Sequence, residues 1–317
     1  AREVFPEVLD RLRRYFEVED NQADVVLGVE GLKARLADKV GALTAATDPV
    51  TAEVIAAAPQ LKAICNFAVG YNNIDLAACN KAGVMATNTP GVLDDTTADL
   101  AWALLMSTAR RLPAAERWLR KGEWKGWQFI QWLGSDIHHA TLGILGMGRI
   151  GQAVARRARG FDMKVIYHNR SRLPVEQEAD IGAGFVDKET LLREADFLVL
   201  LLPYSPATHH CIGAAELAQM KPTAHLINVA RGGIVDDVAL IAALKDGRIA
   251  GAGIDVFEGE PKFNPGFLEL DNVSLSPHIG SSSAATRMAM AMRAADNLIA
   301  ALAGERPPNL LNPEVLQ

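Results

Sequence analysis

The chain has few cysteines, no long apolar run and no excess of positive charge. Its 317 residues contain three cysteines, Cys65, Cys79 and Cys211, which are far apart and lack the spacing of metal ligands. We therefore expect reduced thiols in a cytoplasmic protein with no metal site. No apolar stretch has the length of a membrane span, and the first five residues do not resemble a signal peptide.

The charge balance also excludes one class of partner. The net charge is -6 and the pI is about 5.7, whereas a nucleic-acid-binding protein needs a basic face. A small anionic substrate stays compatible with this surface, because one cationic pocket is enough to bind it. With 49% hydrophobic and 22% charged residues, the composition is that of a globular protein, and the length fits two domains.

Short apolar runs alternate with amphipathic segments through the first 90 residues or so. This alternation is typical of a parallel sheet covered by helices. An α/β domain usually starts with a strand, whereas the first segment here already resembles a helix. We therefore expect a strand to precede it. We expect helices at 7–12, 51–58 and 76–82, and strands at 23–28, 61–66 and 84–88.

A long helix, expected at 96–112 after the cap-like pair Asp94-Asp95, leads to a second unit of the same kind. A last helix is expected at 284–303, ending at Gly304. The strands expected in the second unit are 141–145, 164–167, 197–202, 225–229, 251–256 and 273–275.

The second unit opens with a strand that runs into G-x-G-x-x-G and then a helix. Gly146 permits the tight turn, Gly148 lets the backbone approach a pyrophosphate, and Gly151 lets the helix pack closely on the strand. The free N–H groups of the helix N-terminus bind phosphate. The motif alone is weak, but the strand before it and the helix after it predict a dinucleotide site.

The next strand lacks the acidic residue that would bind the ribose hydroxyls of NAD. Asn169 occupies that position, followed by Arg170 and Arg172. Because arginines pair with a 2′-phosphate that an acid would repel, this segment favours NADP(H). The alternative is that both arginines are simply solvated and that NAD(H) is also accepted.

Three polar side chains follow strand ends further along the chain. Arg231, before two glycines, offers a planar guanidinium that can hold a carboxylate and polarise a carbonyl. His278 can donate a proton, and a carboxylate such as Glu260 would orient it and raise its pKa. Each residue could instead be structural, Arg231 in a salt bridge and His278 in the core. Together at one edge of a sheet they favour catalysis.

These motifs resemble the D-isomer-specific 2-hydroxyacid dehydrogenases over nearly the whole chain. Within that family the segments 138–144 and 167–172 look most like NADPH-dependent glyoxylate/hydroxypyruvate reductases and 2-ketogluconate reductases. The matching segments are 69–75, 88–91, 97–99, 142–151, 228–232, 255–261 and 277–280.

The resemblance implies an α/β fold of two Rossmann-like or flavodoxin-like parallel-sheet domains with a cleft between them. Residues 1–92 and 284–317 would form the substrate-binding domain, and 93–283 the dinucleotide-binding domain. It also implies a homodimer built on the long helix and the segment after it. That segment holds Trp118, Trp124, Trp127 and Trp132, and aromatic residues are enriched at interfaces. The alternative places these tryptophans in the core of a monomer.

The resemblance also assigns roles to residues. Arg231 would bind the substrate carboxylate and keto oxygen, His278 would be the acid/base and Glu260 would orient it. The backbone N–H groups of Val69 and Gly70 would hold the carboxylate from the other side. The cofactor would contact Asp255 at the nicotinamide and Arg149 and Ile150 at the pyrophosphate; the remaining cofactor contacts expected are Thr97, Pro203, Thr208, Val229, Ala230, Gly280, Arg231 and His278.

The implied activity is the reduction of a small 2-keto acid by NADPH to the D-2-hydroxy acid. Glyoxylate, hydroxypyruvate and 2-ketogluconate all stay open, because the loops near 45–50, 66–72 and 264–268 set the size of the pocket. The alternatives are an NAD-linked phosphoglycerate or formate dehydrogenase, a dinucleotide-sensing corepressor, and a hydrolase that uses bound NAD.

Overall fold

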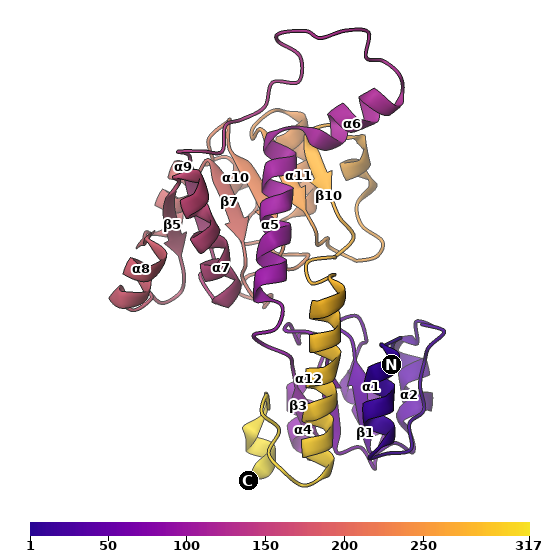
Figure 1. The fold of residues 1–317 in the computed structure, drawn as a ribbon. Coiled ribbons are helices and arrows are strands. Elements are labelled where there is room, and N and C mark those ends of the chain that lie inside the picture. The colour runs from indigo at the N-terminus through magenta and orange to yellow at the C-terminus, as the bar shows by residue number, and fades with distance from the viewer. The chain divides into compact units, whose positions relative to one another are not determined.

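The structure, a computed structural model of residues 1–317, consists of two compact units. The first unit comprises Ala1–Leu93 and Ser282–Gln317, and the second comprises Asp94–Ser281. Both chain termini therefore belong to the first unit (Figure 1). The divisions fall within two residues of the boundaries expected from the sequence.

The first unit is built on a three-stranded parallel sheet of order β1-β2-β3. The central strand is buried along its whole length, which is why it reads as a continuous apolar run. Helix α12 packs along the sheet, with α1 beside it. The elements are α1 (Pro6–Arg13), α2 (Gly28–Leu36), β1 (Gly41–Thr44), α3 (Ala52–Ala56), β2 (Ala63–Asn66), α4 (Leu76–Ala82), β3 (Met85–Thr87) and α12 (Ala284–Leu302).

The strand expected at 23–28 is wrong. Asp24 has a left-handed backbone with φ 49°, and the Asn21 side chain donates to the Val25 carbonyl, so this stretch is a loop. Val25 and Val26 are 54% and 72% exposed, whereas a strand inside a parallel sheet would bury them. The helix α2 and the strand β1 that follow were not predicted.

The second unit is built on a seven-stranded parallel sheet of order β10-β9-β8-β7-β4-β5-β6. All six expected strands are present, and the short edge strand β6 was missed. Three expected strands end earlier than predicted, so residues 201–202, 229 and 255–256 belong to loops. The strands are β4 (Thr141–Leu145), β5 (Lys164–His168), β6 (Ala183–Phe185), β7 (Phe197–Leu200), β8 (His225–Asn228), β9 (Gly251–Ile254) and β10 (Val273–Leu275).

Helices cover both faces of this sheet. Alternate residues of its strands point to opposite faces and enter two different apolar clusters. In β7, Phe197 and Val199 pack in one cluster and Leu198 and Leu200 in the other. Helix α5 lies across one face, in front of the sheet in Figure 1. The helices are α5 (Asp94–Ala109), α6 (Leu112–Arg120), α7 (Arg149–Ala158), α8 (Val175–Ile181), α9 (Lys188–Glu194), α10 (Ala214–Leu217) and α11 (Asp237–Lys245).

The strand order places the loops that carry the site. All the strands are parallel, so their carboxyl ends share one edge, and the order reverses at β4, which lies between β5 and β7. Ligands of open α/β sheets bind at such a switch point. None of the helices is both long and apolar enough to cross a membrane.

Candidate active site

The glycine loop after β4 has the close contacts that its three glycines predict. Gly146 has φ +107°, and a Cβ there would lie 2.7 Å from the Leu201 carbonyl carbon. A Cβ on Gly151 would lie 2.5 Å from the Gly146 oxygen, so the start of α7 approaches the loop as only glycine allows. At Gly148 a Cβ would meet nothing within 4 Å. The space over Gly148 is therefore open from outside the protein.

The N-terminus of α7 fits a pyrophosphate group. Gly148 is its N-cap and provides no side chain to bind the first N–H groups of the helix. Arg149 and Ile150 form the first turn, and Arg149 is exposed. Free N–H groups, the positive end of the helix dipole and an open approach are the features that bind phosphate. A dinucleotide would be held here by backbone groups of 148–151.

Asn169 does more than replace the acidic residue of NAD-binding sites, because its side chain also holds the glycine loop. Its Oδ1 accepts a hydrogen bond of 2.7 Å from the Met147 N–H, in the middle of the glycine loop. The Gly146 N–H donates to the His168 carbonyl at 3.0 Å. The segment after β5 and the glycine loop are thus joined at two points, beside the position where the adenosine ribose of a dinucleotide would lie.

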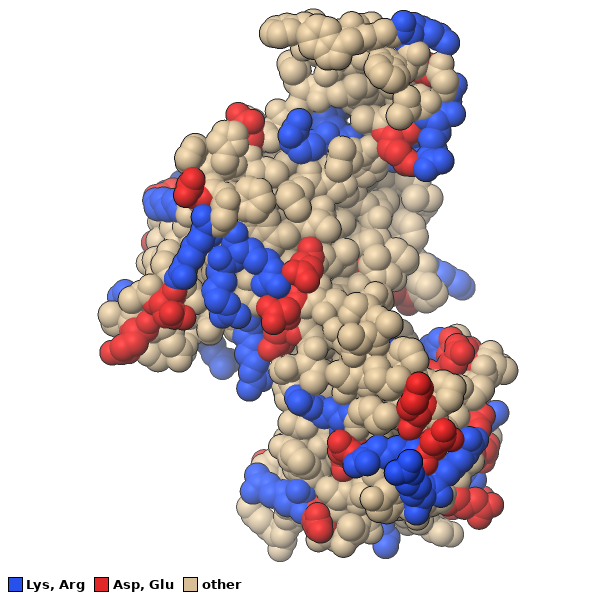
Figure 2. Space-filling view, in the orientation of Figure 1, with Lys and Arg blue, Asp and Glu red and all other residues tan.

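The two arginines of this segment are in different environments. Arg170 is exposed and makes no ion pair or hydrogen bond within the protein. Arg172 is bound by Glu178 of α8, with Nε 2.9 Å from Oε1 and NH2 2.7 Å from Oε2. In the sequence the two arginines look equivalent, and the pairing of Arg172 with Glu178 was not predicted. In Figure 2, Lys and Arg side chains gather over α7, with Asp and Glu side chains over α8 beside them.

His278 and Glu260 form the pair that the sequence predicted. His278 Nδ1 lies 2.7 Å from Glu260 Oε2, and the other carboxylate oxygen accepts the Phe257 N–H at 2.7 Å. Burial alone would raise the pKa of Glu260, but the hydrogen bond with His278, the charge of His278, the Phe257 N–H and lastly the charge of Arg231 together lower it. Because the carboxylate is ionised, Nδ1 donates to it, and Nε2 is the ring nitrogen that would carry a reactive proton in the imidazolium form.

Arg231 lies near this pair because of a glycine. A Cβ on Gly232 would lie 1.8 Å from the Phe257 oxygen, so the loop after β8 touches the loop after β9 through bare backbone. The Arg231 guanidinium donates to the Ala230 carbonyl at 2.7 Å. Burial lowers the pKa of Arg231, and Glu260 opposes that shift. The guanidinium makes this hydrogen bond and none of the salt bridges of the protein, and its role in binding a substrate stays a prediction.

Asp255 holds the loop that carries His278. Its Oδ1 accepts Ser276 Oγ–H at 2.6 Å and the Ile279 N–H at 2.8 Å, and its Oδ2 accepts the Gly280 N–H at 2.9 Å. Burial raises the pKa of Asp255, against these hydrogen bonds. The sequence did not assign Ser276 a role, although it stands two residues before His278. The contact of Asp255 with a nicotinamide stays a prediction.

The remaining expected cofactor contacts lie on loops of the same edge or beside them. Thr97 of α5 is buried next to Gly280, where a Cβ would lie 3.5 Å from the threonine Cγ2. Thr208 closes its own loop by donating to the Pro203 carbonyl at 2.9 Å. Val229 and Ala230 follow β8 directly. The structure thus brings these predicted residues onto one unit, and their contacts with a cofactor stay predictions.

Val69 and Gly70 belong to the first unit, on the loop after β2. Their N–H groups donate to no acceptor within the protein. Their carbonyl groups are held, Val69 O by Asn88 Nδ2 at 2.8 Å and Gly70 O by Asn66 Nδ2 at 2.9 Å. A carbonyl shares its peptide plane with the next N–H, so the bond to Val69 O orients the Gly70 N–H, and the bond from the Thr89 N–H to Ala68 O at 3.1 Å orients the Val69 N–H. Such fixed, free N–H groups suit a carboxylate. The sequence did not predict these two supporting asparagines.

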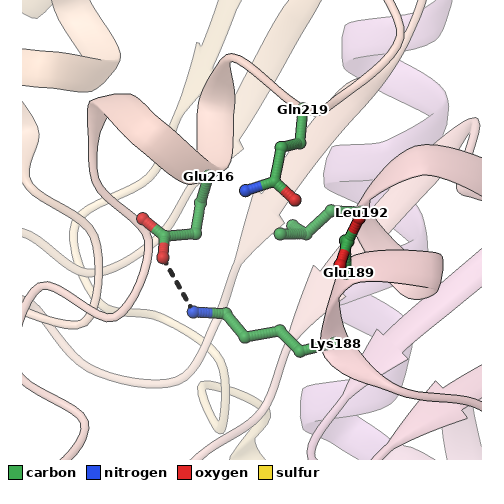
Figure 3. A pocket seen from close by; sticks show the side chains of 5 residues that line it. All are labelled: Lys188, Glu189, Leu192, Glu216 and Gln219. Atoms are coloured by element: carbon green, nitrogen blue, oxygen red, sulfur yellow. Dashed lines mark hydrogen bonds and ion pairs between the residues drawn. The ribbon is translucent and has the colours of Figure 1, made fainter.

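The second unit has two other polar clusters, one between α9 and α10 and one that includes Glu258, on the loop that also carries Glu260. A surface hollow between α9 and α10 is lined by Lys188, Glu189, Leu192, Glu216 and Gln219 (Figure 3), and its lysine is already paired with Glu216 at 3.0 Å. His209, His210 and Glu258 bring metal-binding atoms within 4.8 Å of one another. His210 Nε2 lies 3.1 Å from Glu258 Oε2, and His209 Nδ1 lies 3.2 Å from Tyr204 Oη.

Comparison with known proteins identifies the family. Residues 102–280 match the family model described as "D-isomer specific 2-hydroxyacid dehydrogenase, NAD binding domain". The chain therefore belongs to the D-isomer-specific 2-hydroxyacid dehydrogenases. It is an oxidoreductase that acts on CH–OH groups with a nicotinamide dinucleotide, as its motifs predicted.

Individual relatives give more detail. The chain is 48% identical to a glyoxylate reductase of Thermococcus onnurineus over 96% of this chain and 92% of the relative. It is 54% identical to a glyoxylate reductase of Thermococcus litoralis over 86% of this chain and 84% of that one. A solved NADPH-dependent glyoxylate/hydroxypyruvate reductase of Sinorhizobium meliloti, in complex with NADP and malonate, aligns with TM-score 0.86, 36% identity and coverage of 99% and 95%.

Proposed function

We propose that the protein reduces glyoxylate, or a 2-keto acid of similar size, to the D-2-hydroxy acid with NADPH. The observation that carries the chemistry is the 2.7 Å bond between His278 and Glu260, with the charge of Arg231 acting on the same carboxylate. This arrangement provides a proton donor and a cation on adjoining loops of one sheet edge, as reduction of a keto acid requires.

The residues divide the work of the reaction. A bound nicotinamide dinucleotide supplies the hydride. Arg231 binds the substrate carboxylate and polarises the keto oxygen, because a guanidinium can serve two oxygens in one plane. His278 gives its Nε2 proton to the oxygen of the forming hydroxyl. Glu260 keeps the ring in the required tautomer and stabilises the charged form before transfer.

The substrate class is supported by the names of the relatives and by the first unit. Both Thermococcus relatives are glyoxylate reductases. The Sinorhizobium structure is described as NADPH-dependent and as active on glyoxylate and hydroxypyruvate. The free N–H groups of Val69 and Gly70 suit a small carboxylate. Hydroxypyruvate and 2-ketogluconate are the further substrates to compare.

The preference for NADPH rests on charge. Asn169 offers an amide in place of a carboxylate, and Arg170 is exposed beside it with no partner. A 2′-phosphate would meet the cation of Arg170 there. The nearby acid, Glu178, is already paired with Arg172. NAD(H) stays a possible second cofactor, because the glycine loop serves both.

We also propose a homodimer that works in the cytoplasm. Apolar side chains that a monomer would leave in water are concentrated at the end of α6 and in the segment after it: Leu119, Trp124, Trp127, Phe129, Ile130 and Leu133 are 52%, 57%, 78%, 82%, 76% and 65% exposed. Such exposure supports the interface over the alternative of a monomer core. The three free cysteines support the location.

One assay tests the proposal. Oxidation of NADPH and of NADH is measured side by side with glyoxylate, hydroxypyruvate and 2-ketogluconate at neutral pH. We expect turnover with glyoxylate, with a larger kcat/KM for NADPH. A larger value for NADH would overturn the cofactor preference. Folded protein that binds a dinucleotide but turns over none of the three substrates would contradict the activity and favour a sensor.

A further inference from the structure

The loop between β5 and α8 is held at its two ends and left free at its tip. At its start, Asn169 accepts the Met147 N–H of the glycine loop. At its end, Arg172 binds Glu178 through two hydrogen bonds, and the Leu173 N–H donates to Tyr167 Oη at 2.8 Å. Arg170 and Ser171 are exposed between these points. The loop that would meet the 2′-phosphate is therefore fixed at its base, and only its tip is open.

Glu178 is the centre of this support. Its side chain is 7% exposed, whereas that of Arg172 is 59% exposed. Besides Arg172, it accepts Tyr167 Oη–H at 2.6 Å, and Tyr167 is fully buried in the core below. A nearly buried carboxylate needs such partners, since an unpaired charge there would be costly. The two partners keep Glu178 in one position.

The ionisation of the cluster agrees with this geometry. The hydrogen bonds from Arg172 and then from Tyr167 hold the pKa of Glu178 below its ordinary value. Burial, and then the bond to Glu178, raises the pKa of Tyr167 to about 12, so its hydroxyl remains a donor at neutral pH. The pair of Arg172 and Glu178 thus stays charged and intact under working conditions.

We propose that the two hydrogen bonds that Arg172 donates to Glu178 make Arg172 a positioning residue of the cofactor loop and leave Arg170 as the residue that selects the 2′-phosphate. A bidentate carboxylate already occupies Nε and NH2 of Arg172 and compensates its charge. Only NH1 is left unbonded. Arg170, which has no partner, retains its full charge for a ligand. This inference rests on the proposed use of NADPH and divides the work between two arginines that look equivalent in the sequence.

The loop support should matter to both cofactors. The same loop carries Asn169, whose amide fixes Met147 between Gly146 and Gly148, where the pyrophosphate of NAD and of NADP would bind alike. Loosening the loop at Arg172 would therefore weaken the two dinucleotides by a common factor. Removing Arg170 would weaken only the one that carries a 2′-phosphate.

The test measures binding without turnover. Isothermal titration gives the Kd of NADP⁺ and of NAD⁺ for the full chain and for each variant, with no keto acid present. For R170A we expect the Kd of NADP⁺ to rise about tenfold or more, as loss of one charge-assisted contact implies, with NAD⁺ changed less than about twofold. For R172A and E178Q we expect both Kd values to rise by a common factor of about three to ten.

Two further variants separate position from charge. Y167F removes the hydroxyl that holds Glu178 and Leu173 and changes no charge, so it should weaken both cofactors in the same direction. The double variant R172A/E178Q should bind both cofactors no more weakly than the single variant with the lower affinity, because the two substitutions remove the same interaction. R193A is the matched control: Arg193 pairs with Glu189 on the exposed face of α9 and should leave both Kd values unchanged.

Three results would overturn the inference. An R172A variant that loses NADP⁺ affinity as strongly as R170A, with NAD⁺ unchanged, would make Arg172 a direct ligand of the 2′-phosphate. An E178Q variant that binds NADP⁺ more tightly would make Glu178 only a repelling charge. Unchanged affinities in R172A, E178Q and Y167F would show that the loop needs no support. Equal affinity of the parent protein for both cofactors would instead refute the NADPH preference, and the common loss in R172A and E178Q would still decide the role of Glu178.

Discussion

The two units hold their candidate binding groups in opposite ways. In the first unit, side chains of Asn66 and Asn88 fix carbonyl groups, and the backbone N–H groups of Val69 and Gly70 are left free. In the second unit, backbone N–H groups fix the carboxylates of Asp255 and Glu260, and side chains are left to react. The first arrangement suits recognition of a carboxylate and the second suits proton transfer.

The largest effect should follow from removing the proton donor of the second unit. His278→Ala takes away the group that delivers the proton, so we expect kcat to fall by about 10³-fold, within the range of general acid catalysis. Binding of NADP⁺ should be largely kept, because the glycine loop is remote in sequence and is held independently. Steady-state kinetics and titration check both; a variant with near-normal kcat would remove His278 as the acid.

A support of the first unit should affect binding more than chemistry. Asn88→Ala frees the Val69 carbonyl, so the Gly70 N–H in the same peptide plane loses its orientation. We expect KM for the keto acid to rise about tenfold, the size of one lost hydrogen bond, with a smaller change in kcat. Asn272→Ala, which frees the carbonyl of Leu244, is the control. A fall in kcat with unchanged KM would contradict the comparison.

A support of the second unit should affect chemistry more than binding. Ser276→Ala removes the 2.6 Å hydrogen bond to Asp255 and loosens the loop of His278. We expect kcat to fall about fivefold, with KM nearly constant, since one neutral donor to a carboxylate is lost while two N–H donors remain. Ser274→Ala on β10, which loses a bond to Ser107, is the matched control and should keep its kcat.

The smallest effect concerns stability and pH. Asp237, which accepts the Glu258 N–H at 3.1 Å, has a pKa raised to about 6 by burial. A carboxyl whose pKa is higher in the folded state stabilises the fold below its unfolded pKa and loses this contribution as pH rises through about 6. The parent should therefore lose stability between pH 5 and pH 8, whereas Asp237→Asn should not. The Tm of the variant minus that of the parent should be about 2–4 °C larger at pH 8 than at pH 5. Thermal unfolding at the two pH values measures it, and an equal difference at both would refute the shift.

Much of the fold could be predicted because its signals are local. Each strand of the second sheet is a short apolar run, and the glycines at 146, 148 and 151 specify a turn by sterics alone. The error at 23–28 has a local cause too: Val25 and Val26 look like a strand, but the side chain of Asn21 binds the backbone there instead. The strands β1 (Gly41–Thr44) and β6 (Ala183–Phe185) each contain a glycine, an alanine and only one large apolar side chain, so they form no apolar run.

The contact between His278 and Glu260 could be predicted for the same reason, because both residues follow strands whose ends meet at one edge. The supports could not. Glu178 lies six residues after Arg172, on the far side of a turn, and nothing in that spacing reveals that the two meet. Asn88 and Val69 come together only after the chain has folded between them. Contacts of this kind depend on tertiary structure rather than on a motif.

The bond between Asn169 and Met147 has a consequence for redesign of the cofactor site. Exchanging Asn169 for Asp would supply the acid that NAD enzymes use and keep an acceptor for the Met147 N–H. Exchanging it for Leu or Ala would leave that N–H without a partner and disturb the turn over which every dinucleotide must bind. Few substitutions at position 169 can therefore change the cofactor preference without disturbing the glycine loop. They are those that keep an oxygen where Oδ1 of Asn169 accepts the Met147 N–H.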